Sequence, residues 1–395
     1  MLLQCKCTLE QVLKHDSAVY CGRGQGTPRC TKAMDVPPEL VMQILEHAYY
    51  DANGQPDRRT LCACALLCTS WSSVAQALLL RHVRVPGSKA RSDLQTVPRP
   101  IFLTGSERAQ MLASHVRRAE ITVEDTDDEV TLVELIYHCC HLYELTLRIN
   151  GVHAFSLSTV EALGKPVVTE RLTPIRSLAL LSCGIQSPIL YQLLMIWPAI
   201  RFLRLGTELA AAPPRYSTFE GSLYELSLLR TPCVEGMGWL LSNSRETLRI
   251  LECHVAPEGA HRDILAKHTP HLLSLRFFRH TRGVPTLLRQ CNSLREVMFT
   301  QVSDFLPLGE MPATLEHFTF RHFVGTQAVV PPSIVQAIEK LPRLRLVSCD
   351  ISARLAANYG ALEEKCTQKG VIIDHDVVPI RTVCLASRAR HCLRN

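Results

Sequence analysis

Apolar residues recur through most of the chain in one short pattern, in which three apolar positions are separated by two residues and then by one. Successive copies begin 21 to 33 residues apart (315 minus 294 and 175 minus 142). They are LYELTL at 142, IRSLAL at 175, IRFLRL at 200, LYELSL at 223, LRILEC at 248, LLSLRF at 272, LREVMF at 294, LEHFTF at 315 and LRLVSC at 344, with a degenerate copy, VRRAEI, at 116. Each copy predicts one short β-strand with alternate side chains buried.

The segments between these copies predict helices. In SPILYQLLMIWPAI, Leu190, Leu194 and Trp197 repeat on one helical face, and Pro198 ends the helix. The period and the Leu-x-x-Leu-x-Leu core resemble a leucine-rich repeat. We therefore expect an α/β fold in which residues 116–375 form a solenoid or horseshoe. Stacked strand–helix units would share one continuous core and one curved sheet.

A different pattern, typical of amphipathic helices, precedes the repeats. Leu40, Ile44 and Ala48 recur every four residues after Asp35 and two prolines, which suit the start of a helix. A polar loop follows at 51–59, then a second helix at 60–71 and a third from residue 72, which leads into the extended stretch HVRV. We expect a three-helix domain over residues 34–85.

Three cysteines fall close together in the second predicted helix, TLCACALLCTSW. On a regular helix Cys64 and Cys68 share one stripe, whereas Cys62 lies about 160° from Cys64. Three thiols in this arrangement cannot converge on one metal ion, and a tetrahedral site needs a fourth ligand as well. We interpret Cys64 and Cys68 as small apolar residues on the core-facing side of the helix.

The first two helices resemble the F-box, a three-helix motif that reads Leu-Pro, Glu-Leu, Ile and then Leu-x-x-Cys-x-x-Val-Cys-x-x-Trp. Val36 stands where leucine is usual and Leu67 where valine is usual, and the ending LLLRHVRV resembles the fungal branch of the family. The resemblance implies docking on a Skp-type adaptor and, through it, on a cullin. The residues that match the pattern are Pro37, Glu39, Leu40, Ile44, Leu61, Cys64, Cys68 and Trp71. The expected adaptor contacts are Pro37, Glu39, Leu40, Ile44, Leu61, Leu67 and Trp71.

In a horseshoe, alternate strand positions face the concave side of the sheet. Arginine and aromatic side chains are favoured there as binding hot spots. The alternative is an ordinary solvated sheet face. The candidates for contacting a protein target are Arg204, Glu252, His254, Arg276, Phe278, Met298 and Arg321, with Thr300 and Thr319 on the same face.

The composition indicates which partners and which cellular location to expect for the protein. The net charge of +6 (43 Lys and Arg minus 37 Asp and Glu) is mild and does not call for a nucleic-acid partner. The 17 cysteines are odd in number and irregularly spaced, which favours reduced, mostly buried thiols. We see no secretory leader and no apolar run long enough to span a bilayer. The expectation is a cytoplasmic or nuclear protein, or one found in both places, with no membrane partner.

The remaining segments have weaker signals. Residues 1–33 are expected to be a poorly ordered leader, because Cys5, Cys7, Cys21 and Cys30 lack the paired spacing of zinc ligands. Residues 86–115 are interpreted as a linker or first cap, and 376–395 as a basic tail. The acidic stretch EDTDDE at 124–129 is interpreted as a solvated loop.

No phosphate-binding loop, nucleophile elbow or zinc-protease motif is found in the sequence. The F-box resemblance implies a substrate-recognition subunit of an SCF-type ubiquitin ligase, whose repeats hold an unknown protein target. Such a subunit has no catalytic residues, metal or cofactor of its own. Two alternatives stay open: a leucine-rich-repeat scaffold with a vestigial F-box, and a cysteine- or metal-dependent enzyme suggested only by the cysteine count.

Overall fold

The computed structural model describes residues 36–49, 57–89, 106–168, 174–279, 283–301, 311–321 and 330–375. The chain divides into two units, one built on residues 1–83, 101–117 and 378–395, the other on 84–100 and 118–377. We describe each unit by itself. The predicted leader, with Cys5, Cys7, Cys21 and Cys30, and the predicted basic tail lie outside the described residues.

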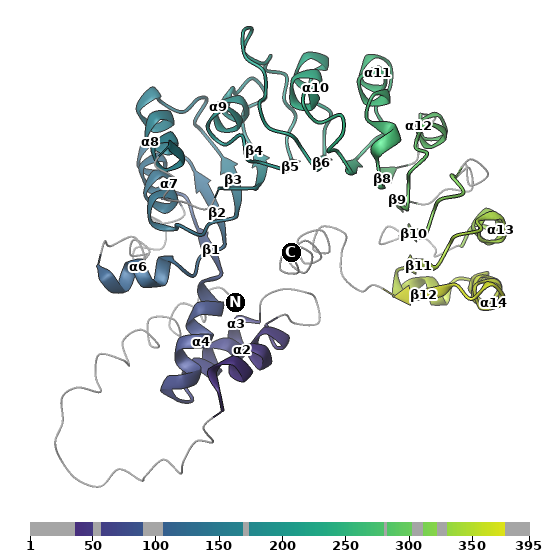
Figure 1. The fold of residues 1–395 in the computed structure, drawn as a ribbon, viewed down its shortest axis with the longest axis horizontal. Coiled ribbons are helices and arrows are strands. Elements are labelled where there is room, and N and C mark those ends of the chain that lie inside the picture. Colours follow the sequence, from purple (N-terminus) through teal and green to yellow (C-terminus); the bar gives the residue numbers. More distant parts are fainter. Residues whose placement is uncertain are drawn as a thin grey trace. The chain divides into compact units, whose positions relative to one another are not determined.

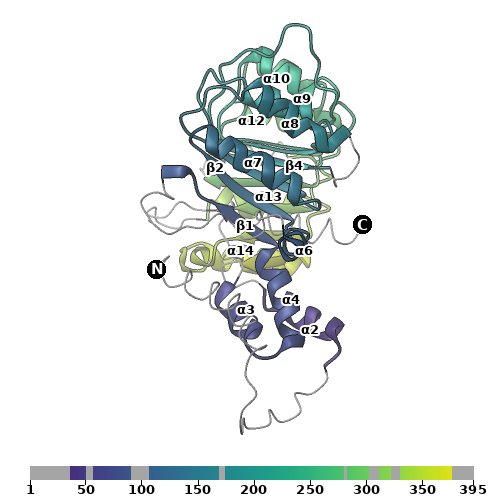
Figure 2. The same ribbon diagram turned by 90° about the vertical axis from the view of Figure 1, so that its left-hand side faces the viewer.

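The first unit contains three packed helices, which we call the three-helix unit: α2 (Pro38–His47), α3 (Arg58–Ala65) and α4 (Thr69–Leu80) (Figure 2). Proline fits the first turn of α2, where the missing N–H would have no helical partner. Asp57 begins α3, because its carboxylate accepts hydrogen bonds from the backbone N–H and the hydroxyl of Thr60. The shared core contains Val41, Leu45, Tyr49, Leu61, Cys62, Ala65, Val74, Ala75, Leu78 and Leu79.

The single helix predicted over residues 60–71 is wrong, because the chain breaks between α3 and α4. Cys68 has an extended backbone and directly precedes α4, so it does not share a helical stripe with Cys64. Cys62, which the helical wheel placed away from the core, is the buried thiol of the three. Cys64 packs against the core only in part. Residues 51–56 of the predicted loop lie outside the described residues, whereas Arg58 already belongs to α3.

The segment predicted as a linker contains a helix of its own, α6 (Glu107–Ala113). The Ser106 hydroxyl accepts a hydrogen bond from the backbone N–H of Ala109 and so satisfies one of the free donors at the helix start. Leu112 and Ala113 are buried. Residues 90–105 lie outside the described part of the chain.

A sheet of twelve strands runs in sequence order from β1 to β12, and β2 to β12 pair in parallel. Every copy of the apolar pattern overlaps a strand, so the expected α/β repeat fold is confirmed at this level. The sheet begins earlier than residue 116, because HVRV forms β1. The strands are β1 (His82–Val85), β2 (Arg118–Val123), β3 (Glu144–Ile149), β4 (Ser177–Ser182), β5 (Phe202–Leu205), β6 (Glu225–Leu228), β7 (Ile250–Cys253), β8 (Ser274–Arg279), β9 (Glu296–Gln301), β10 (His317–Phe320), β11 (Leu346–Cys349) and β12 (Ile372–His375).

Helices cover one side of this sheet, and the second unit forms a solenoid-like array with strands on its inner side and helices on its outer side (Figure 1). The alternation of the strands explains this arrangement. Leu203 and Leu205 are buried towards the helices, whereas Arg204 between them faces the inner side. The helices are α7 (Thr126–His138), α8 (Leu157–Val168), α9 (Ile189–Ile196), α10 (Val234–Leu241), α11 (Ala260–Ala266), α12 (Val284–Gln290), α13 (Pro332–Lys340) and α14 (Tyr359–Lys369), with short 3-10 turns η2 (Thr269–His271) and η4 (Ile351–Leu355).

The connection between β5 and β6, all of which the structure describes, departs from the alternation of strand and helix. Residues 206–224, between β5 and β6, contain no helix, although Phe219 is fully buried. Side chains from the neighbouring helices bond to the main chain of this segment: the Tyr191 hydroxyl donates to the carbonyl of Ala211 (2.8 Å), and the Trp239 indole N–H donates to that of Ser217 (2.9 Å). Phe219 also packs on Trp239. The segment is therefore fixed by side chains rather than by helical hydrogen bonds.

The acidic stretch 124–129 is not the solvated loop that its composition indicated. Asp125 begins α7 by accepting a hydrogen bond from the N–H of Asp128, and Asp128 accepts others from the N–H groups of Glu124 and Ser88. Asp128 and Glu129 are buried. These carboxylates bind main-chain donors near a helix start, where negative charge is favourable.

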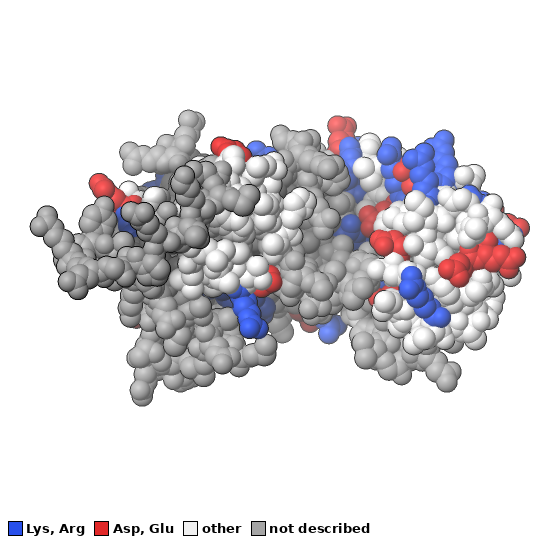
Figure 3. Space-filling view, turned by 90° about the horizontal axis from the view of Figure 1, so that it is seen from below, with Lys and Arg blue, Asp and Glu red and all other residues white. Residues whose placement is uncertain are grey.

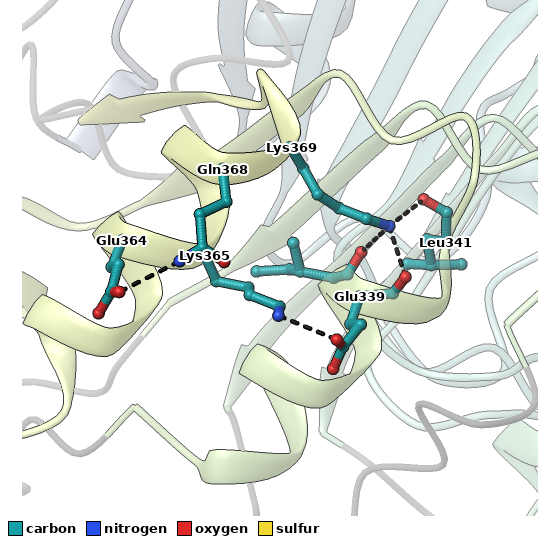
Figure 4. A network of polar contacts seen from close by, with 7 residues as sticks. Glu339, Leu341, Glu364, Lys365, Gln368 and Lys369 are labelled. Atoms are coloured by element: carbon teal, nitrogen blue, oxygen red, sulfur yellow. Dashed lines mark hydrogen bonds and ion pairs between the residues drawn. The ribbon is translucent and has the colours of Figure 1, made fainter.

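We expect Lys369→Met to destabilise the C-terminal repeats. The Lys369 ammonium donates to the carbonyls of Ile338 (2.8 Å), Glu339 (2.5 Å) and Leu341 (3.4 Å), at the end of α13 where carbonyls lack helical partners (Figure 4). Loss of these charged hydrogen bonds should lower the free energy of unfolding by about 1–2 kcal/mol. Chemical denaturation measures this change.

The matched control is Lys365→Met, which removes one exposed ion pair, with Glu339 at 2.9 Å. Exposed pairs contribute about 0–1 kcal/mol, so the control should change stability less than Lys369→Met. Equal losses in the two variants would show that the carbonyl contacts of Lys369 do not stabilise the helix end.

Candidate functional site

Four of the predicted target contacts, Arg204, Glu252, Arg276 and Met298, lie in one row across the inner face of the sheet. Strand register places Arg204 opposite Ser227, Ser227 opposite Glu252, and Glu252 opposite Arg276. The row continues from Arg276 to Met298 on β9. These side chains therefore lie on neighbouring strands of one face, at about 5 Å per strand.

Most arginines of the inner face are held by acidic neighbours. Glu120 accepts from both Arg84 (2.9 Å) and Arg148 (3.1 Å). Arg276 and Glu296 approach to 3.3 Å. Burial opposes ionisation of Glu296, but the positive charges of Arg276 and His317, together with hydrogen bonds from Arg276 and Ser274, lower the pKa of the carboxyl. Because these arginines already form ion pairs with glutamates, few charged groups of the inner face are left to bind a ligand.

Arg204 differs from these arginines, because no ion pair to it is found within the described part of the chain. Its cross-strand neighbours are the small residues Ala179 and Ser227. Phe202, two residues earlier on the same face, packs against Tyr224 with ring centroids 5.8 Å apart. A half-buried guanidinium beside an aromatic pair can bind an anionic side chain that has an apolar neighbour.

In the C-terminal half of the inner face, the predicted contact residues are less accessible than the sequence indicated. His254 stacks on Phe278 at 4.4 Å between ring centroids. Arg321 is buried and lies 3.4 Å from Asp350. Met298 is buried as well, so little of either side chain is accessible, and the contact roles of Met298 and Arg321 stay predictions that the burial does not favour.

His317 is an inner-face residue that the sequence analysis missed. Its ring nitrogen Nε2 lies 2.8 Å from the Ser348 hydroxyl and 3.0 Å from the Thr319 hydroxyl. Burial is the main reason that its pKa is lowered, against the attraction of Glu296. The residue stands at the third position of LEHFTF, two before the position used to select contacts, and that periodicity could have identified it.

The three-helix unit has a second candidate surface, on α2 and the turn after α3. Leu40 and Ile44 each expose 48% of their surface, and Leu67 is exposed too. Pro37 and Glu39 are exposed at the start of α2. These five residues are placed where a partner can reach them.

Two predicted adaptor contacts lie elsewhere. Leu61 has no exposed surface and belongs to the core, so its burial does not favour the predicted contact role. Trp71 is half-buried and packs against the same core. Leu66, exposed beside Leu67, was missed, although an unbroken Leu-Leu pair at the end of a predicted helical face could have indicated it.

Most described thiols with shifted pKa values are held in the protonated form by burial, and Cys68 is the exception among them. Burial raises the pKa of Cys139 and of Cys291 to about 12. Cys349 lies 3.6 Å from the Nδ1 atom of His375, yet burial raises the pKa of its thiol to about 12 as well. A thiol with such a pKa is protonated near neutral pH and reacts slowly. Within the described ranges, no three His, Cys, Asp or Glu side chains are grouped so that they could hold a metal ion.

Comparison with known protein families and curated proteins gives no match. No protein-family model matches the sequence, and no curated protein is similar to it. Among the described helices, none is both long and apolar enough to cross a bilayer.

We expect alkylation to distinguish Cys68 from Cys139 in the native protein. The Ser70 hydroxyl and nearby backbone N–H groups lower the pKa of Cys68, so this thiol holds more thiolate at a given pH than an ordinary cysteine. Burial has the opposite effect on Cys139. Peptide mapping by mass spectrometry after brief iodoacetamide treatment should find Cys68 modified first.

The modification rate of Cys68 should fall as the pH is lowered, because the thiolate is lost. Denatured protein is the control, since unfolding should remove most of the difference between the two thiols. Faster labelling of Cys139 in the native protein would contradict the burial described for it.

Proposed function

We propose that this protein is a substrate-recognition subunit of an SCF-type cullin-RING ubiquitin ligase, with an F-box in its three-helix unit and leucine-rich repeats in its array. One observation carries the proposal. On α2, Val41 and Leu45 form the core, whereas Leu40 and Ile44 remain exposed at positions that match the F-box pattern. Exposed apolar side chains on a helix indicate a surface that a partner covers.

The size of the three-helix unit supports the same interpretation. A module of about fifty residues buries little apolar surface and is only marginally stable by itself. Adaptor binding would cover Leu40, Ile44 and Leu67, and the exposed Pro37 and Glu39 would lie at the edge of that contact. The adaptor would connect the chain to a cullin.

The array would supply the second half of the function. Its inner face presents Arg204 with Phe202 and Tyr224, a combination suited to a protein target. Holding the adaptor and the target on one chain raises the local concentration of the target near the ubiquitin-transfer machinery. The protein itself would contribute no catalytic residue, and a cytoplasmic or nuclear location follows from such a role.

We expect co-expression with a Skp-type adaptor to give a stable one-to-one complex, and Leu40→Asp with Ile44→Asp to abolish it. The double variant should keep its fold, because both side chains are half-exposed and each charge remains in water. Loss of two apolar anchors should weaken binding by at least a hundredfold, or about 3 kcal/mol. Co-purification and calorimetry measure the complex.

The matched control is Met111→Asp with Val130→Asp, which places the same charges at exposed apolar positions of α6 and α7. This variant should bind the adaptor as the unaltered chain does. A complex that never forms, or that survives the Leu40 and Ile44 changes, would instead favour a leucine-rich-repeat scaffold with a vestigial F-box.

A further inference from the structure

A line of arginines follows the rim of the array where the strands begin. From β4 onwards, the residue that directly precedes the first paired position is arginine in five repeats, and we call Arg176, Arg201, Arg249, Arg295 and Arg345 the basic rim. Figure 3 shows that Lys and Arg side chains gather on part of one face, with Asp and Glu side chains nearby. Because arginine recurs at the same position of the repeat, the line of arginines follows from the repeat architecture.

The backbone fixes the spacing of the rim. Arg201 donates its N–H to the carbonyl of Arg176 (2.8 Å), Tyr224 donates to Arg201, and Arg249 donates to Tyr224. The same line of bonds continues through Leu273, Arg295, Glu316 and Arg345. From Arg201 onwards, arginines therefore occupy every second strand, about 10 Å apart.

The charges of the rim are largely uncompensated. No ion pair to Arg176, Arg201, Arg295 or Arg345 is found among the residues that the structure describes. Arg176, Arg295 and Arg345 are exposed, and Arg201 is half-exposed. The inner-face arginines, in contrast, are mostly paired with carboxylates. The rim thus offers guanidinium groups to a ligand from outside.

We propose that the basic rim binds an extended acidic segment of a partner protein. In the extended polyproline II conformation, three residues span about 9 Å and every third side chain lies on the same side, so an acidic residue at every third position would meet one arginine after another. Guanidinium groups bind carboxylates through paired charge-assisted hydrogen bonds. The rim residues differ from the inner-face contacts and from the α2 contacts, so the inference does not depend on the proposed ligase function.

A carboxylate within the line favours a peptide over a nucleic acid. Glu316 stands between Arg295 and Arg345, and it would repel a backbone that carries a phosphate at every step. A peptide can place a neutral or basic residue opposite Glu316. The carboxylate would then contribute to selection of the sequence rather than oppose binding.

The test uses the full chain and a fluorescent peptide of Glu-Gly-Ser repeats that is long enough to span the rim, with a Gln-Gly-Ser peptide as its uncharged match. Fluorescence anisotropy at about 50 mM salt limits screening. We expect the Glu peptide to bind at least tenfold more tightly than the Gln peptide. Arg295→Glu with Arg345→Glu should weaken Glu-peptide binding roughly tenfold, since two attractive contacts become repulsive.

The matched control is Arg215→Glu with Arg230→Glu, which changes the net charge equally at exposed positions away from the rim. It should change the affinity less than about twofold, by the screening of distant charges. Arg345→Gln provides a milder second variant, and circular dichroism checks that each variant is folded.

Three results would overturn the proposal: equal affinity for the two peptides or none for either, loss of binding that is the same in rim and control variants, or tighter rim-dependent binding of an oligothymidylate of equal charge. The last result would assign the rim to a nucleic acid.

Discussion

Burial of apolar side chains between each strand and its helix is the interaction on which the array depends. Leu145, Leu226 and Val297 each have essentially no exposed surface, although they belong to repeats far apart in the chain. Complete burial of one such side chain contributes about 1.5–3 kcal/mol relative to exposure. No repeat buries its apolar side alone, so each one is stable only between its neighbours. The register of the sheet, and hence every side chain on its inner face and rim, follows from this constraint.

The same sheet presents two kinds of charged surface. On the inner face, Glu120 and Glu296 neutralise nearby arginines, so that face is polar but electrically balanced. On the rim, Arg295 and Arg345 stand near only one carboxylate of the same line, Glu316. The modest net charge of +6 therefore hides an uneven distribution. Long-range attraction of an acidic partner would come from the rim, and close selection from the inner face.

The sequence predicts the array well because one short pattern determines both burial and direction. The spacing of IRFLRL alone places Leu203 and Leu205 in the core and Arg204 on the inner face, as the structure has them. The break between α3 and α4 was missed, because helical periodicity continues on both sides of Cys68. The spacing of apolar residues does not reveal that the backbone of a single residue, Cys68, is extended.

Other features depend on partners distant in the chain. The role of Asp128 involves the N–H of Ser88, 40 residues earlier, so composition alone indicated a solvated loop. The ion pair between Arg321 and Asp350 joins neighbouring repeats, so it cannot be seen in either repeat alone. Leu61 fits a docking pattern in the sequence, yet the packing of three helices places it in the core. Contacts between residues that are far apart in the sequence cannot be predicted from a local pattern of residues.

The connection between β5 and β6 has a consequence for how such an array can change in evolution. Solenoids lengthen and shorten by duplication or deletion of whole repeats, which succeeds where each boundary resembles the next. Residues 206–224 are held from one side by Tyr191 and from the other by Trp239, two contacts that no helix would reproduce. Recombination at this point would separate the segment from one of its two supports. The repeats of α9 and α10 are thus coupled through this segment, and removal of either one would leave the segment with a single support.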